Sequence, residues 1–208
     1  MIEKIKSISK VEWLAVALIV IGVAIMIPKA MGMVEFYKES RYAAEHDFSA
    51  GNLSPDLIRP WMSIRYIAVA YAVPQIYLYN AVGIKPHPET SMLSLNRLNQ
   101  QMDLGQVDDQ PALMKTIREA ILAYRAAPVV TGLLEQEAHE WMTVLYISNS
   151  TGVPVKTIFA GIGLPVEGNA HKPLGFLSET TNYSGGTKAL VAAVQKVLDA
   201  QGVEPAQP

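Results

Sequence analysis

The sequence predicts an all-α protein in which an N-terminal single transmembrane helix is followed by two tandem three-helix repeats of helix-turn-helix type. Residues 13–27 form an apolar run without a charge. Residues 60–84 and 140–164 match one another at an offset of 80 positions, with their apolar residues in phase. Nowhere do apolar and polar residues alternate in the way that favours a half-buried strand. Helices are therefore expected throughout.

The composition of the 208 residues excludes several classes of protein. Half of the residues are hydrophobic and only 17% are charged, against about 25% in typical domains. This balance excludes a disordered chain. The net charge of −2 offers no basic surface for nucleic acid. Cysteine is absent, which excludes disulfides, thiolate-held metal clusters and thiol nucleophiles.

A membrane anchor is predicted at residues 11–34, between a short flank at 1–10 and a juxtamembrane linker at 35–55. As a helix, the uncharged run would span roughly 22 Å, which is short of the ~30 Å hydrocarbon core. The segment up to Val34 supplies the remaining length if a lysine within it reaches the headgroups. The predicted anchoring side chains are Trp13, Lys29, Phe36 and Tyr37.

A cleaved signal peptide is the alternative for this segment, but no cleavage site of small residues follows the apolar run at the required distance. Counting basic residues gives a slight bias that places the amino terminus in the cytoplasm. The predicted location is the bacterial inner membrane, with extracytoplasmic C-terminal modules. The predicted partners are the lipid bilayer and an integral membrane protein complex.

Self-comparison of the chain reveals a duplication. The two matching stretches share seven identities in 25 ungapped positions, which chance does not readily produce. We name the two copies repeat 1 (56–126) and repeat 2 (127–202), followed by a flexible tail at 203–208. The identical pairs are Trp61/Trp141, Met62/Met142, Tyr66/Tyr146, Ile67/Ile147, Val73/Val153, Pro74/Pro154 and Gly83/Gly163.

Each repeat carries helix signals in the same order. Ser63 and Thr143 are good N-caps for a first helix. Ala72 and Gly152 fit the left-handed position that ends it, where alanine is the poorer choice. A proline then starts a second helix, which stops at a glycine. A third helix is expected to open at Asp109-Gln110-Pro111 in repeat 1, and at 188–200 in repeat 2.

Repeat 2 resembles a small, uncharacterised helical module that is often appended to bacterial membrane-bound redox proteins, such as ferredoxin-like and b-type cytochrome-like chains. The residues that carry the resemblance are Trp141-Met142-Thr143, Gly152-Val153-Pro154 and Gly161-Ile162-Gly163-Leu164-Pro165. Repeat 1 departs from the motif, with Ala72 for the glycine and Lys85 for the final proline. The resemblance implies an association with membrane electron-transfer assemblies. It transfers no catalytic residue.

The helix-turn-helix pattern also raises a DNA-binding alternative. The second helix would then present its early side chains to the bases of the major groove. These side chains include one lysine and no arginine, so nucleic acid is an unfavoured partner. They are Gln75, Ile76, Tyr77 and Asn80 in repeat 1, and Val155, Lys156, Thr157 and Ala160 in repeat 2.

No catalytic, cofactor or metal site is predicted, and no small-molecule substrate is identified. His139 follows two glutamates without the spacing of a zincin motif. His87 and His171 occupy corresponding loops, which leaves a paired metal or quinone contact open beside ordinary exposed histidines. The acidic pair Asp108-Asp109 is interpreted as a helix cap. A glycine pair before Lys188 is interpreted in the same way, because no strand precedes it.

Three aromatic residues are predicted to contact a partner: Trp61, Tyr71 and Tyr77. The two tyrosines have no aromatic counterpart in repeat 2, so packing shared by both repeats does not require them. The predicted function is a non-catalytic, single-pass accessory subunit of a respiratory or photosynthetic electron-transfer complex. The alternative is a membrane-tethered helix-turn-helix regulator that binds DNA or a cytoskeletal partner.

Overall fold

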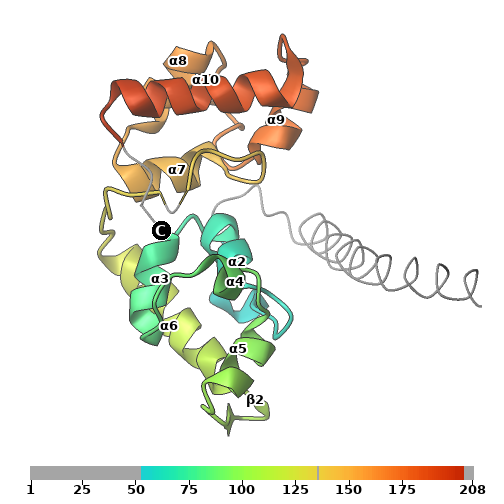
Figure 1. The fold of residues 1–208 in the computed structure, drawn as a ribbon, viewed down its shortest axis with the longest axis vertical. Helices are drawn as coiled ribbons and strands as arrows, with labels where there is room; N and C mark the ends of the chain where they lie inside the picture. The colour runs from blue at the N-terminus through green and yellow to red at the C-terminus, as the bar shows by residue number, and fades with distance from the viewer. Residues whose placement is uncertain (1–52, 135, 204–208) are drawn as a thin grey trace, which may run out of the picture. The chain divides into compact units, whose positions relative to one another are not determined.

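The computed structural model describes residues 53–134 and 136–203, which are mostly helical (Figure 1). The elements of repeat 1 are η3 (Pro55–Leu57), α2 (Ile64–Ala70), α3 (Gln75–Val82), α4 (Pro88–Ser91), α5 (Leu95–Gln101), β1 (Gln106–Val107), β2 (Gln110–Pro111) and α6 (Ala112–Ala126). The elements of repeat 2 are α7 (Val144–Thr151), α8 (Val155–Ile162), α9 (Leu174–Thr180) and α10 (Gly186–Ala200). The order α2, α3, α5, α6 of repeat 1 matches the order α7, α8, α9, α10 of repeat 2, and α4 is an addition in repeat 1.

The predicted membrane architecture requires a correction. No helix in the described ranges is long and apolar enough to cross a membrane, since the longest of them have 15 residues and a span needs about 20. The predicted transmembrane helix, single-pass topology and inner-membrane location are accordingly wrong for the part of the chain that the structure describes. The segment 11–34 and its anchoring residues Trp13, Lys29, Phe36 and Tyr37 lie outside the described residues.

Both repeats have more helices than the three predicted, α4 and α5 in repeat 1 and α9 in repeat 2. Two of these, α5 and α9, have seven residues each and precede the long last helix of their repeat. Each carries a pair of buried leucines three positions apart, Leu95 and Leu98 in α5, Leu174 and Leu177 in α9. So short an apolar pattern gives almost no periodic signal, which is why the prediction missed both helices.

The all-α prediction is also wrong at the start of α6, where β1 and β2 form a two-stranded antiparallel ribbon. Asp108 and Asp109 form its two-residue loop, with φ values of 51° and 57°. This pair of left-handed residues is the type I′ geometry that matches the twist of a hairpin. The acidic pair therefore builds a turn and does not cap the helix. Instead, the Leu113 N–H donates to Asn99 Oδ1 at 2.9 Å.

The predicted boundaries of the first helices are confirmed. The hydroxyls of Ser63 and Thr143 each accept a hydrogen bond from the backbone N–H three residues later, at 3.1 Å in both repeats. Ala72 has φ 51° and Gly152 has φ 82°, so both adopt the left-handed conformation expected after the helix. Repeat 1 therefore holds an alanine in a conformation that repeat 2 assigns to glycine.

Main-chain hydrogen bonds join the residues just before α2 to the start of α5, and the residues just before α7 to the start of α9; we call this pair of bonds the main-chain clasp. In repeat 1, Leu95 N donates to Met62 O at 2.8 Å and Asn96 N to Pro60 O at 2.9 Å. In repeat 2, Leu174 N donates to Met142 O at 2.9 Å and Gly175 N to Glu140 O at 2.8 Å. The same main-chain clasp therefore occurs in both repeats.

Each repeat has its own core around its long last helix. In repeat 1, α3 and α5 pack on α6; in repeat 2, α8 and α9 pack on α10. The buried residues of α6 include Leu113, Met114, Ile117 and Ile121, and those of α10 are Leu190, Val194 and Leu198. At an offset of 77, Leu113, Ile117 and Ile121 correspond to these three α10 residues. This correspondence aligns the two long helices.

Two side-chain contacts join the repeats. The guanidinium carbon of Arg65 lies 5.0 Å from the centre of the Trp141 ring, within cation–π range. Asn149 Nδ2 donates to Ala72 O at 2.7 Å. The second contact uses the carbonyl of the left-handed alanine, so the turn that ends α2 also serves the junction.

Candidate functional site

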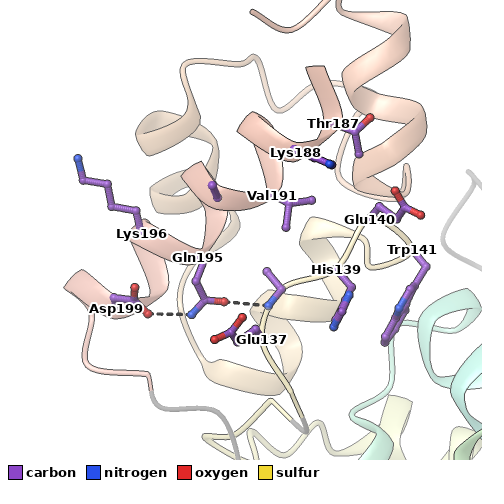
Figure 2. Close-up of a pocket in the computed structure, with 12 residues that line it drawn as sticks. Glu137, His139, Glu140, Trp141, Thr187, Lys188, Val191, Gln195, Lys196 and Asp199 are labelled. Atoms are coloured by element: carbon purple, nitrogen blue, oxygen red, sulfur yellow. Dashed lines mark hydrogen bonds between the residues drawn. The ribbon is translucent and has the colours of Figure 1, made fainter. Parts of the chain in front are cut away.

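A groove of about 530 Å³ lies in repeat 2, between residues 137–141 and one face of α10 (Figure 2). Ala138 and Val191 supply apolar surface to it, and charged side chains stand around it. The lining residues are Glu137, Ala138, His139, Glu140, Trp141, Thr187, Lys188, Val191, Ala192, Gln195, Lys196 and Asp199. We call this feature the repeat 2 groove.

Gln195 connects the two walls of the groove. Its Oε1 accepts from the Ala138 N–H at 2.8 Å, and its Nε2 donates to Asp199 Oδ1 at 2.7 Å (Figure 2). With both ends of the amide engaged, the side chain has a defined orientation. Glu137 is drawn beside Gln195, so two carboxylates lie near this end of the groove.

Repeat 1 has larger side chains at the positions that correspond to Ala138 and Val191. At an offset of 80, Ala138 corresponds to Ile58, which is 0% exposed; at an offset of 77, Val191 corresponds to Met114, which is 1% exposed. Isoleucine exceeds alanine by a methyl and an ethyl group, and methionine is longer than valine. A cavity of about 230 Å³ lies between the β1–β2 hairpin and α6, and neither Ile58 nor Met114 lines it.

A hydrogen bond in each repeat supports this correspondence. Arg118, the counterpart of Gln195, directs its Nη2 to Ile58 O at 3.4 Å. Gln195 bonds to the backbone of Ala138. In both repeats, therefore, the same position of the long helix holds the backbone of the same position in the preceding segment. Two differences between the repeats accompany the groove: the smaller Ala138 and Val191 in repeat 2, and the β1–β2 hairpin that stands at the start of α6 in repeat 1.

The structure places the three predicted contact residues in different environments. Tyr71 is only 5% exposed; its hydroxyl donates to Ser54 O at 2.9 Å, and Arg125 lies over its ring at 5.7 Å. Tyr71 is thus a core residue of repeat 1. Trp61 is half-buried, with its ring 5.6 Å from that of Tyr66, a pairing that Trp141 and Tyr146 repeat at 6.3 Å.

Tyr77 is half-buried and meets Tyr124 edge-on, with ring centres 5.2 Å apart. Burial, and secondarily the neighbouring Tyr77, raise the pKa of Tyr124 above 10.0. The two rings join α3 to α6, so Tyr77 contributes to packing within repeat 1. None of the three predicted contact residues lines the repeat 2 groove.

The described histidines differ in their environment. His139 is exposed and stacks on Trp141, with ring centres 6.0 Å apart and planes 10° apart. His87 is exposed, and His171 is half-buried, where burial lowers its pKa below 6.5. Within residues 53–134 and 136–203, no three His, Asp or Glu side chains are grouped so that they could hold a metal ion.

The early side chains of α3, which a DNA-binding protein would present to the bases, are mostly buried or half-buried. Gln75 is buried and donates from Nε2 to the Tyr79 hydroxyl at 3.2 Å. Ile76 and Tyr77 are half-buried, which leaves Asn80 as the exposed side chain among the four of repeat 1. Such a face offers few groups for base edges.

Comparison of the chain with protein-family models, with curated proteins and with solved structures gives no match. The likeness of repeat 2 to the module of membrane-bound redox proteins therefore stays a prediction from its motif.

Proposed function

We propose that the described part of the chain is a non-catalytic, tandem helical module that docks a protein partner through repeat 2. The observation that carries the proposal is the contrast between two copies of one design. Repeat 1 fills a position of its core with Ile58 and Met114, whereas repeat 2 has Ala138 and Val191 there and an open groove of about 530 Å³. The groove is open to solvent and leaves apolar surface of Val191 and Ala192 in contact with water, which a docked partner would cover.

In this proposal the repeats have separate roles. Repeat 1 is a closed support, and the contacts of Arg65 with Trp141 and of Asn149 with Ala72 O hold repeat 2 against it. Repeat 2 presents the groove, whose walls Gln195 ties together. The motif resemblance makes an electron-transfer protein the first class of partner to test.

A photo-crosslinking amino acid placed in the full chain, in its native cells, tests the proposal. At Lys196, which is exposed and lines the groove, we expect a discrete crosslinked protein that mass spectrometry identifies. The matched control places the same amino acid at Glu179, which is exposed on α9 and does not line the groove. Equal products at both positions, or none at Lys196, would refute the docking role.

The visible absorbance of the captured partner tests the redox association separately. Haem, flavin or iron–sulfur bands in the crosslinked product would support an electron-transfer partner. A colourless partner would leave the docking role in place and end the redox part of the proposal.

A further inference from the structure

We infer that the cavity between the β1–β2 hairpin and α6 of repeat 1 binds the phosphate group of a small molecule. This site is separate from the repeat 2 groove and does not depend on the proposed docking function. The cavity has a volume of about 230 Å³, and two cations, Lys115 and Arg118, line it from one face of α6. The other lining residues are Val107, Asp108, Gln110 and Pro111.

The hydrogen bonding of Arg118 indicates that an acceptor is missing from this cavity. A guanidinium carries five N–H donors. Within the described residues, Nη2 of Arg118 makes one long bond, 3.4 Å to Ile58 O, and its Nε is buried without a hydrogen-bond partner. Buried donors in native structures are nearly always paired, with protein, water or a bound ion. An anion in the cavity would supply acceptors that this guanidinium lacks.

Repeat 2 shows that the packing shared by the two repeats requires neither cation. At an offset of 77, Lys115 corresponds to Ala192 and Arg118 to Gln195. The amide of Gln195 is engaged at both ends, at 2.8 Å and 2.7 Å, whereas the guanidinium of Arg118 has its one long bond. The hairpin that forms the other wall of the cavity is likewise described in repeat 1 alone. Both walls of the site are therefore additions of repeat 1 to the common packing.

The set of donors in the cavity favours phosphate over a carboxylate. A phosphate group presents three strong acceptor oxygens, so a guanidinium can take two of them while an ammonium takes the third. A carboxylate has two oxygens and would leave one of the two cations without an acceptor. Asp108 is the one carboxylate in the lining, against the cations of Lys115 and Arg118, so an excess of positive charge remains to attract an anion.

Isothermal titration calorimetry of the full chain with inorganic phosphate, at constant ionic strength, tests the inference. We expect saturable binding to one site. Lys115→Ala, which places the residue of repeat 2 at an exposed position, should weaken binding about tenfold, the loss expected for a hydrogen bond to a charged group. The matched control Lys196→Ala removes an exposed lysine outside the cavity and should leave the affinity unchanged. No saturable binding, or equal affinities of the two variants, would overturn the inference.

Asp108 allows a test in the opposite direction. Asp108→Asn removes the negative charge, and asparagine tolerates the left-handed conformation, φ 51°, that the hairpin needs at this position. The variant should bind phosphate several-fold more tightly; unchanged or weaker binding would overturn the inference. Acetate that binds as tightly as phosphate would overturn the choice of phosphate. Phosphate should leave crosslinking from Lys196 unchanged, because the two sites lie in different repeats, so the failure of either proposal is observed separately.

Discussion

A close approach of α8 to α10 at Gly161 allows a test of packing in repeat 2. A Cβ built on Gly161 would overlap Val197 Cγ2, and it would lie 3.5 Å from Val197 Cβ. At the corresponding positions repeat 1 has Ala81 and Ala120. At this contact repeat 2 pairs a glycine with a valine, whereas repeat 1 has alanine at both positions.

The perturbation is Gly161→Ala, alone and together with Val197→Ala. Alanine is favoured over glycine in a helix by about 0.5–1 kcal/mol. Against this gain, an overpacked contact costs about 1–3 kcal/mol, and the valine has little freedom to turn away because its χ1 is restricted in a helix. We therefore expect Gly161→Ala alone to destabilise the chain by about 1 kcal/mol.

In the Val197→Ala background the sign should reverse. The obstructing methyl groups are then absent, so Gly161→Ala should stabilise the chain by about 0.5 kcal/mol. The resulting coupling free energy of roughly 1.5 kcal/mol is within the range for residues in contact. Urea unfolding of the four proteins, followed by circular dichroism, measures it. Stabilisation by Gly161→Ala in the wild-type background would refute the close approach of these helices.

Three further predictions concern single residues. Gly152→Ala should destabilise the chain by about 1–2 kcal/mol in urea unfolding, because φ is 82° and the new Cβ would lie 3.0 Å from Val130 Cγ1; no loss of stability would contradict the left-handed turn. Tyr71→Phe should cost about 1 kcal/mol in urea unfolding, since the hydroxyl no longer donates to Ser54 O, and should leave crosslinking from Lys196 unchanged, whereas lost crosslinking would return Tyr71 to the contact surface. Because burial lowers the pKa of His171 in the folded state, stability should be full above pH 6.5 and fall as the pH drops below it. The urea midpoints at pH 7.5 and pH 5 measure this loss, and His171→Gln should reduce it; an equal loss in that variant would assign it to other groups.

Local chemistry made part of the fold predictable. The hydroxyls of Ser63 and Thr143 and the left-handed residues Ala72 and Gly152 act through neighbours a few positions away, so their roles follow from sequence. The hairpin at Asp108-Asp109 was missed because strands of two residues are too short to alternate. An acidic pair before a helix also fits a cap as well as a turn.

The repeat 2 groove could not be predicted from the matching stretches alone. It depends on Ile58 and Ala138, which lie just outside the stretches 60–84 and 140–164, and on Met114 and Val191, which the aligned long helices bring to the same face. The signal lies in the differences between the repeats, and the first of them, isoleucine at position 58 against alanine at position 138, stands two residues before the matching stretches.

The main-chain clasp has a consequence for how the two copies could diverge after the duplication. Its donors and acceptors are all backbone atoms, and it joins Pro60 to Asn96 in one copy and Glu140 to Gly175 in the other. A proline is acceptable at position 60 because only its carbonyl takes part. Since the clasp imposes almost no side-chain identity, mutations could accumulate around it without loss of the fold. The same clasp therefore fits both the closed packing of repeat 1 and the open groove of repeat 2.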